Sequence, residues 1–254
     1  MSAGAPSTTI MTMRRQIDPA LVDRLRDARG NQVMFVSHCL LDENVRYPGG
    51  AFHSGATPEA VRMLRSGIGI CQMPCPEAQT WGGVHKPAMM AGYGLRDSPL
   101  YRFRRPLFRL FVFYTRVRYC LLARQVARQV RQYHRAGVQV TAVIGVGASP
   151  SCGVTTTLDI DRSFETLAGC PLKRIDRTMV NRCVAESCVA GEGLFMRSLR
   201  SRVRRLGITP QFLEHDLIAE MHGTNQTLAI AEAVRDVSPA AVRIRPGRPR
   251  ERQR

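Results

Sequence analysis

This sequence of 254 residues lacks any apolar run long enough to cross a bilayer. Its longest dense apolar stretches, such as LFRLFVFYTRV at 107–117, are too short and too interrupted by arginine to do so. The N-terminal stretch MSAGAPSTTIMTMRRQ also lacks the apolar centre of a secretory signal peptide. We therefore expect a cytoplasmic protein without a transmembrane segment, in which cysteines stay reduced and are free to bind a metal or to react.

Lysine is also scarce, because Lys86 and Lys173 are the only two lysines among 37 cationic side chains. The formal net charge is nevertheless +17, and a basic chain can bind nucleic acid, anionic lipid or an acidic partner. Part of this charge lies in the stretch RIRPGRPRERQR from residue 243, which has no apolar periodicity and is predicted to be disordered. That placement weakens the case for one organised basic face.

What the sequence does contain is an alternation of strand-length apolar runs and segments with helical spacing. Strands are predicted at 31–39, 68–73, 138–147 and, less distinctly, 208–216. Helices, several of them with an Asp or Thr cap, an early proline or a terminal glycine, are predicted at 18–28, 57–67, 116–137, 191–207 and 225–237. This alternation predicts an α/β fold with a parallel sheet covered by helices on both faces.

The chain is divided into a flexible leader at 1–17, a single α/β domain at 18–237 and a disordered Arg/Pro-rich tail at 238–254. A basic and aromatic segment lies at about 96–135 within the domain. Three interpretations of this segment stay open. It could stack on RNA and neutralise its phosphates, lie on a membrane surface, or form an amphipathic helix against the core with its arginines extended to water.

Three of the eight cysteines follow predicted strands. Cys39, Cys75 and Cys152 each lie in a turn-rich loop, in SHCLLDENVRYPGG, MPCPE and ASPSCG respectively. The carboxyl ends of parallel strands meet at one edge of a sheet, where such folds build their binding sites, so these cysteines could converge. Nearby glycines and prolines leave backbone N–H groups free to approach sulfide or thiolate.

Three converging thiolates suit a metal, but the spacing lacks the two close cysteine pairs of a zinc ribbon. Thiolate sites favour zinc or iron–sulfur, and a [4Fe–4S] cluster held by three cysteines would leave one iron open to a substrate. On spacing alone, three buried thiols with no ligand role are an equally good interpretation. Buried or idle thiols are favoured for Cys71, Cys120, Cys170, Cys183 and Cys188.

In chain order, SHCLLDENVRYPGG, CPE followed by GG, GASPSCG and GEGLFMRSLRSRVRRLGI resemble the motifs of the TudS-like thiouracil desulfurase family, across roughly residues 33–216. The resemblance implies a Rossmann-like fold, a [4Fe–4S] cluster held by Cys39, Cys75 and Cys152, and non-redox removal of sulfur from a thiolated pyrimidine. It also implies an acidic residue and a serine near the cluster. The matching catalytic candidates are Glu77 and either Ser149 or Ser151.

Three further residues of the opening motif, His38, Arg46 and Tyr47, are candidates for substrate binding. His38 could contact substrate, donate to a cluster sulfur, or be a loop histidine with its own partners. Arg46 could attract an anionic substrate group, or pair with a carboxylate and anchor the loop. His53 and His85 also lie near the proposed site in the sequence.

The chain departs from the family pattern at His38, Asp42, Pro48 and near Lys86-Pro87, and its segment 96–135 is longer than usual. Because the three cysteines are intact, the sequence predicts an iron–sulfur desulfurase that acts on a small thiolated molecule, with the substrate left open. One alternative is a desulfurase for thiolated RNA. Another is an Fe–S or zinc module that senses redox state or binds RNA through its basic segments.

Overall fold

The computed structural model describes residues 19–25 and 27–224. The predicted leader, the predicted helix at 225–237 and the predicted tail lie outside these described residues. The chain divides into two compact units, the first ending at Gly30 and the second beginning at Asn31. The first unit contains α1 (Pro19–Arg24), which is the helix predicted after Asp18.

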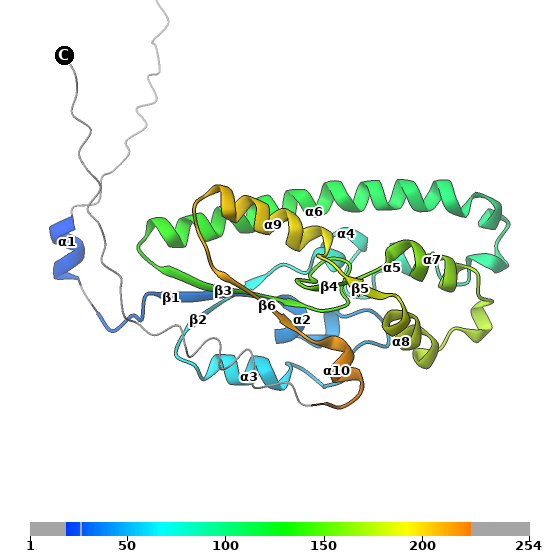
Figure 1. Ribbon diagram of the computed structural model, residues 1–254, viewed down its shortest axis with the longest axis horizontal. Coiled ribbons are helices and arrows are strands. Elements are labelled where there is room, and N and C mark those ends of the chain that lie inside the picture. The colour runs from blue at the N-terminus through cyan, green and yellow to red at the C-terminus, as the bar shows by residue number, and fades with distance from the viewer. Residues whose placement is uncertain (1–18, 26, 225–254) are drawn as a thin grey trace, which may run out of the picture. The chain divides into compact units, whose positions relative to one another are not determined.

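The second unit is built on a four-stranded parallel sheet in the order β2-β1-β3-β6 (Figure 1). Its strands are β1 (Gln32–Ser37), β2 (Gly69–Met73), β3 (Gln139–Val146) and β6 (Gln211–His215). The central strands β1 and β3 are continuous apolar runs, which is typical of strands buried on both faces. The predicted α/β class, a Rossmann-like parallel sheet with helices on both faces, is therefore confirmed.

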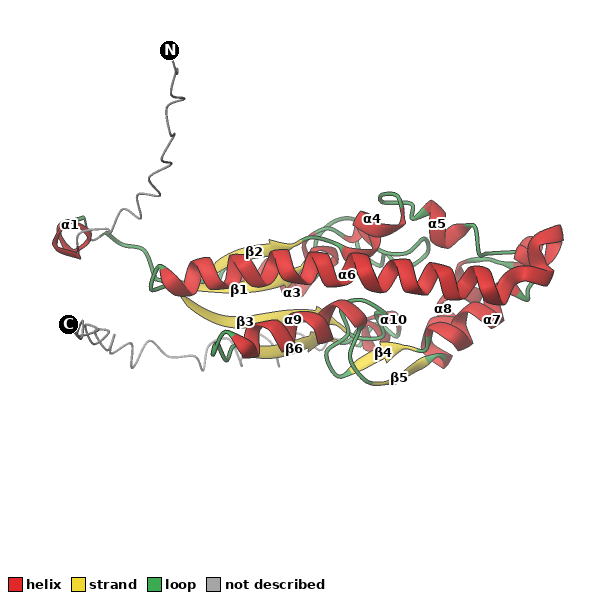
Figure 2. Cartoon of the chain, turned by 90° about the horizontal axis from the view of Figure 1, so that it is seen from above, coloured by secondary structure: helices red, strands yellow, loops and turns green. Residues whose placement is uncertain are grey.

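Helices cover both faces of the sheet (Figures 1 and 2). On the first face, α6 (Arg104–Arg135) packs beside α9 (Leu194–Arg205), and Phe35 of β1 lies in their apolar cluster. On the second face, Met34 packs in a cluster with residues of α3 (Pro58–Leu64) and α10 (Leu217–Met221). The alternation of neighbouring side chains along β1 thus divides the core between two layers.

The remaining elements lie in the connections. Short helices are α2 (His38–Leu41), α4 (Pro76–Trp81), α5 (Pro87–Met90), α7 (Ile160–Ala168) and α8 (Arg177–Glu186). One-turn 3₁₀ helices are η1 (Glu43–Val45), η2 (Leu95–Asp97), η3 (Pro99–Phe103) and η4 (Leu172–Arg174). A two-stranded antiparallel sheet, which the sequence did not predict, joins β4 (Thr156–Leu158) to β5 (Cys188–Ala190).

Most of the basic and aromatic segment forms α6, which begins at Arg104, well before the predicted start at 116. Pro106 falls in the first turn of the helix, where its missing N–H costs nothing, and Gly137 ends it with a positive φ of 78°. Thr115, Tyr119 and a row of later residues are buried on one face of the helix. No described helix combines the length and apolar character that a membrane crossing requires.

Candidate active site

The three strands β1, β2 and β3 bring the three predicted cysteines to one edge of the sheet. Cys39 lies in α2 directly after β1, Cys75 is the N-cap of α4 after β2, and Cys152 lies in the turn after β3. Cys39 is therefore in a helical turn, where the sequence predicted a loop. Strand order reverses between β1 and β3, and in open α/β sheets ligands bind outside the strand ends at such a point.

A cavity of about 380 Å³ opens at this edge of the sheet. The nine predicted site residues all line it: His38, Cys39, Arg46, Tyr47, Cys75, Glu77, Ser149, Ser151 and Cys152. Its remaining wall is largely apolar and includes the aromatic side chains of Trp81, Phe111, Tyr119 and, from α7, Phe164. The volume is within the range of small-molecule sites, which combine apolar walls with a few polar groups.

The three thiols lie close enough to influence each other's ionisation. Burial raises the pKa of Cys39 to about 12, because a thiolate loses its hydration there. Burial also raises the pKa values of Cys75 and Cys152, and the neighbouring thiols add to the shifts at Cys39 and Cys152. At neutral pH the three groups are thus uncharged thiols, and a bound cation is what would favour their thiolate forms.

The spacing of the thiols does not suit a single ion. Thiolates that share one zinc ion stand about 3.8 Å apart, since each Zn–S bond is about 2.3 Å long. Among the described residues, Glu43, His53 and Glu220 have ligand atoms that all lie within 4.8 Å of one another, and the three thiols do not form such a group. The described thiols are thus not arranged like three ligands of one zinc ion.

Glu77 connects the cysteine-bearing segments through its two carboxylate oxygens. Its Oε2 atom accepts a hydrogen bond from Lys86 Nζ at 2.6 Å. Its Oε1 atom accepts from Ser151 Oγ at 3.0 Å and from Ser149 Oγ at 3.4 Å. Because Glu77 lies in the first turn of α4 directly after Cys75, the CPE sequence places a thiol and a carboxylate on the same cavity wall.

The two serines have different positions in the turn after β3. Ser149 Oγ accepts hydrogen bonds from the backbone N–H groups of Ser151 and Cys152, at 3.3 and 3.0 Å. Ser151 Oγ lies 3.0 Å from Ser149 Oγ and also approaches the Cys152 sulfur at 3.6 Å. Ser149 therefore holds the turn together, whereas Ser151 connects the carboxylate of Glu77 with the thiol of Cys152.

Lys86 is a site residue that the sequence interpretation missed. It is 1% exposed, lines the cavity and adopts a left-handed backbone conformation with φ of 50° at the start of α5. Burial alone would lower the pKa of Lys86, but the nearby Glu77 carboxylate outweighs burial and the pKa is raised. The scarcity of lysine was a signal that could have pointed to Lys86. In a chain with so many arginines, a lysine could have been examined as a candidate site residue.

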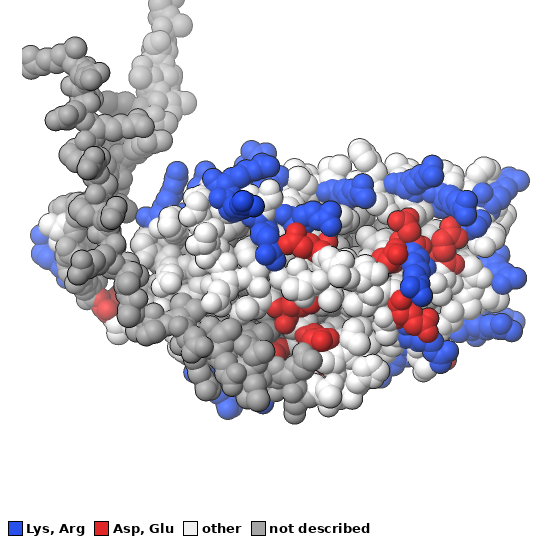
Figure 3. All heavy atoms as spheres, in the orientation of Figure 1, with Lys and Arg blue, Asp and Glu red and all other residues white. Residues whose placement is uncertain are grey.

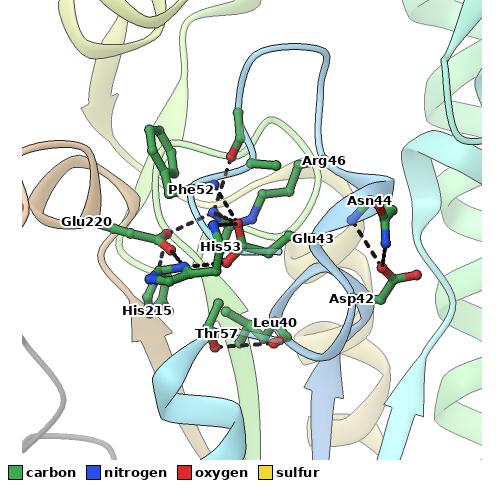
Figure 4. Close-up of polar contacts among 12 residues, drawn as sticks. Leu40, Asp42, Glu43, Asn44, Arg46, Phe52, His53, Thr57, His215 and Glu220 are labelled. Carbon is green, nitrogen blue, oxygen red and sulfur yellow. Dashed lines mark hydrogen bonds and ion pairs between the residues drawn. The ribbon is translucent and has the colours of Figure 1, made fainter. Parts of the chain in front are cut away.

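The loop that follows α2 is held in place by a buried ionic network (Figure 4). Arg46 Nη1 lies 2.9 Å from Glu220 Oε2 and 3.2 Å from Glu43 Oε2, and it donates to the Gly50 carbonyl. Its Nε and Nη2 atoms are buried and have no hydrogen-bond partner among the described residues. These contacts are those of a loop anchor, which was one of the two roles considered for Arg46.

The same network contains the group Glu43, His53 and Glu220, whose ligand atoms are close enough to hold a metal ion. His53 Nδ1 lies 2.7 Å from Glu43 Oε1 and 3.1 Å from Glu220 Oε1. However, Arg46 Nη1 already pairs with the carboxylates of Glu43 and Glu220, and His215 Nε2 lies 2.8 Å from Glu220 Oε2. Because Arg46 and His215 already pair with the oxygens that an ion would need, we interpret the group as an ion-pair network.

The other two residues predicted to bind substrate, Tyr47 and His38, already contact side chains within the protein. Tyr47 Oη donates to Asn181 Oδ1 at 2.9 Å while its residue lines the cavity. His38 Nε2 lies 3.7 Å from Asp42 Oδ2, and His38 is partly exposed. Cys183 also lines the cavity, and its thiol contacts the Ser163 carbonyl. It is not among the groups that shift the pKa values of Cys39, Cys75 and Cys152.

The edge of the sheet thus combines three thiols, a carboxylate with a buried ammonium partner, and two hydroxyls around one small-molecule cavity. Such a set can hold a metal cluster, orient a polar group and move a proton. Comparison with family models, curated proteins and solved structures finds no match for the chain. A function for this site is therefore argued from its own residues and from the motif resemblance.

Proposed function

We propose that this protein is a desulfurase that replaces the sulfur of a thiolated heterocycle with oxygen in a non-redox hydrolysis. The observation that carries the proposal is the convergence of Cys39, Cys75 and Cys152 with Glu77 and Ser151 on one wall of a cavity. These residues come from three separate connections of the sheet, yet they meet where α/β folds bind ligands.

The three thiols would hold a [4Fe–4S] cluster, because thiolates are its usual ligands and the described thiols are not grouped closely enough to share one zinc ion. When bound, such a cluster supplies a Lewis acid that draws electrons from the C=S bond of the substrate. The fit is supported by polar donor groups beside the sulfurs: the N–H of Ala78 donates to Cys75 Sγ at 3.4 Å, and the Ser151 hydroxyl lies 3.6 Å from Cys152 Sγ. Such donors favour the thiolate forms.

Glu77 is the proposed general base. Its carboxylate removes a proton from the water that attacks the thiocarbonyl carbon, and the C–S bond then breaks, so that a carbonyl product and sulfide are formed without electron transfer. Ser151 orients this carboxylate through its 3.0 Å hydrogen bond, and the Lys86 ammonium compensates its charge in the buried site. Ser149 keeps the turn in the geometry that Ser151 and Cys152 require.

The cavity wall supports a planar, weakly polar substrate. Trp81 and Phe111 lie with ring centroids 5.5 Å apart, and Trp81 is fixed by a hydrogen bond from its Nε1 to Thr115 Oγ1 at 3.0 Å. Aromatic walls of this kind stack on heterocycles. A cavity next to the cysteines also favours an enzyme over an Fe–S module that only senses redox state, because a sensor needs no such space.

The setting that this chemistry requires is a reducing compartment, and we propose the cytoplasm. All eight cysteines are free thiols in the structure, including the exposed Cys120. Oxidising conditions would pair or oxidise such groups.

The first experiment is anaerobic purification with iron and sulfide analysis. We expect about four iron and four sulfide per fully loaded chain, the content of the proposed cluster. Replacing Cys39, Cys75 or Cys152 by serine should abolish loading. Cys183→Ser is the matched control, because this buried thiol lines the same cavity and is not a proposed ligand. Bound zinc without labile sulfide would contradict the proposal.

The second experiment offers the loaded protein a panel of thiolated bases, nucleosides and thiolated tRNA. We expect release of sulfide and formation of the oxo product from a free thiolated pyrimidine, with little dependence on salt. Turnover that is confined to tRNA and falls steeply with salt would instead indicate an RNA substrate.

A further inference from the structure

The outer surface of α6 carries an unusual number of exposed apolar side chains. Large apolar residues exposed by 43% or more lie at Leu100, Phe103, Leu107, Leu110, Phe113, Tyr114, Val117 and Leu121. Positions 107, 110, 114, 117 and 121 follow one another at alternating steps of three and four, so they form one stripe along the helix. We call these eight residues the α6 stripe, and its helical part lies opposite the face that contains buried Thr115 and Tyr119.

The second half of the helix is basic. With α9 it forms a groove of about 290 Å³ lined by five arginines: Arg124, Arg128, Arg131, Arg202 and Arg205. Within residues 27–224 the groove has no acidic lining residue, and Arg202 donates to Ser198 Oγ and Cys120 Sγ. Figure 3 shows blue side chains along the edge of the molecule where α6 and α9 lie. We call these five residues the arginine groove.

The charge of α6 excludes pairing with a second copy of the same helix. The sequence of α6 contains nine arginines and no aspartate, glutamate or lysine. Helices that pair through a stripe of this spacing need opposite charges beside it, whereas two copies of α6 would bring arginine against arginine. The occupant of this surface must therefore supply negative charge as well as an apolar environment.

We propose that the α6 stripe and the arginine groove bind the surface of an anionic phospholipid membrane. The arginines match lipid phosphates, and the stripe matches the boundary between headgroups and acyl chains, where leucine and phenylalanine insert. RNA would also supply phosphates, and three stripe residues are aromatic, but the other five are aliphatic and offer no flat ring on which a base can stack. The apolar stripe therefore favours lipid. This inference does not rest on the proposed desulfurase activity.

The test measures cosedimentation of the full-length protein with phosphatidylcholine vesicles, with and without phosphatidylglycerol. Leu110→Gln with Phe113→Gln removes apolar side chains that are 65% and 66% exposed and do not line the active-site cavity. The matched control is Leu64→Gln with Leu172→Gln, at exposed positions elsewhere. Each double variant keeps the same net charge, so only the location of the lost apolar surface differs.

A second pair of variants tests the arginines. Arg128→Glu with Arg131→Glu reverses two charges of the groove, and Arg62→Glu with Arg65→Glu makes the same change at exposed positions at the end of α3. We expect binding to phosphatidylglycerol vesicles that weakens with salt, and a loss of at least about tenfold in affinity for each α6 double variant but not for its control. Neutral vesicles should bind weakly.

Three results would overturn the proposal. Vesicle binding that both α6 double variants retain would place the interaction elsewhere on the chain. Tight binding of single-stranded RNA that needs the arginine groove and not the stripe, without vesicle binding, would make the surface an RNA site. A dimer that Leu110→Gln with Phe113→Gln converts to a monomer would make the stripe a protein interface.

Discussion

The ammonium group of Lys86 lies 2.6 Å from the carboxylate of Glu77, and both side chains are almost completely buried. Glu77 belongs to the first turn of α4, and Lys86 precedes α5, so the ion pair closes the loop between the two helices. A charge at this depth is costly unless its partner is present. The same carboxylate is therefore needed for the stability of the fold, as the partner of Lys86, and for the proposed catalysis, as the base.

Removing one member of this pair should destabilise the protein strongly. Lys86→Met leaves the Glu77 carboxylate buried without its partner, and we expect a loss of about 3–5 kcal/mol in the free energy of unfolding. The double variant Lys86→Met with Glu77→Gln should recover much of this loss, because it removes both charges. Urea unfolding of the wild type, both single variants and the double variant gives the coupling energy. A Lys86→Met protein within about 1 kcal/mol of wild type would contradict this account.

Loss of the carboxylate should affect turnover more than cluster loading. Glu77→Gln keeps the size of the side chain but removes the proposed base, and we expect the rate to fall by about 10²–10⁴. The unpaired Lys86 ammonium should make this variant less stable, but the cysteines are unchanged, so the iron content of the folded protein should stay close to that of the wild type. Near-normal turnover by a fully loaded variant would exclude Glu77 as the base.

The two serines should separate into a catalytic and a structural role. Ser151→Ala removes the 3.0 Å hydrogen bond to Glu77, so kcat should fall by about 10- to 100-fold, the effect of losing a bond to a charged group. Ser149→Ala removes the acceptor for two backbone N–H groups and should lower thermal stability and iron content first. Parallel measurement of kcat, iron and melting temperature distinguishes them. Equal effects of both variants on all three would refute this division.

The position of the cysteines could be predicted because it depends on local sequence and a general rule. Apolar runs in the sequence predicted β1, β2 and β3. The carboxyl ends of parallel strands lie at one edge of the sheet, so residues that follow these strands lie at that edge. The carboxylate of the CPE motif follows Cys75 so closely that its direction is fixed by the same helical turn. The apolar runs of the strands and the helix-start signal at Cys75 were thus sufficient to predict one half of the site, the position of the cysteines and Glu77 at this edge of the sheet.

The other half depends on tertiary packing that leaves no local signal. Lys86 reaches Glu77 because its backbone takes a left-handed conformation that the sequence does not require. The aromatic wall arises because α6 starts at Arg104 and extends beside the cavity, whereas the arginines and proline of this segment made its helical start hard to see. Strands β4 and β5 have three residues each, too few to show an alternating pattern.

A close backbone approach should make Gly193 intolerant of any side chain. A Cβ atom at this position would lie 2.4 Å from the carbonyl oxygen of Ser151 and 2.9 Å from the backbone nitrogen of Cys152. Gly193→Ala should therefore shift the turn that carries Cys152, lower stability by about 1–3 kcal/mol and reduce iron content. Gly55→Ala is the control, since no heavy atom lies within 4 Å of its added Cβ. Normal iron content in Gly193→Ala would show that the turn tolerates the shift.

The ionic network behind the active-site loop should make stability depend on pH through His215. Burial lowers the pKa of His215, but hydrogen bonds with the carboxylates of Glu220 and Glu59 outweigh burial and raise it to about 9 from a usual value of 6.5. Arg46 and His53 are the other charged or titratable groups in contact with Glu220. Because the folded-state pKa is raised, the stabilisation by the charged imidazole is fully present below pH 6.5 and is lost as pH rises through about 9.

The measurement for His215 is urea unfolding of the wild type and His215→Gln across this pH window. We expect the variant to be less stable by on the order of 3 kcal/mol near the low end, and the difference to shrink as pH approaches the raised pKa. His134→Gln, at an exposed position near the end of α6, should show no such trend. A stability difference between wild type and His215→Gln that stays constant or grows with pH would mean that the charged imidazole does not hold this network together.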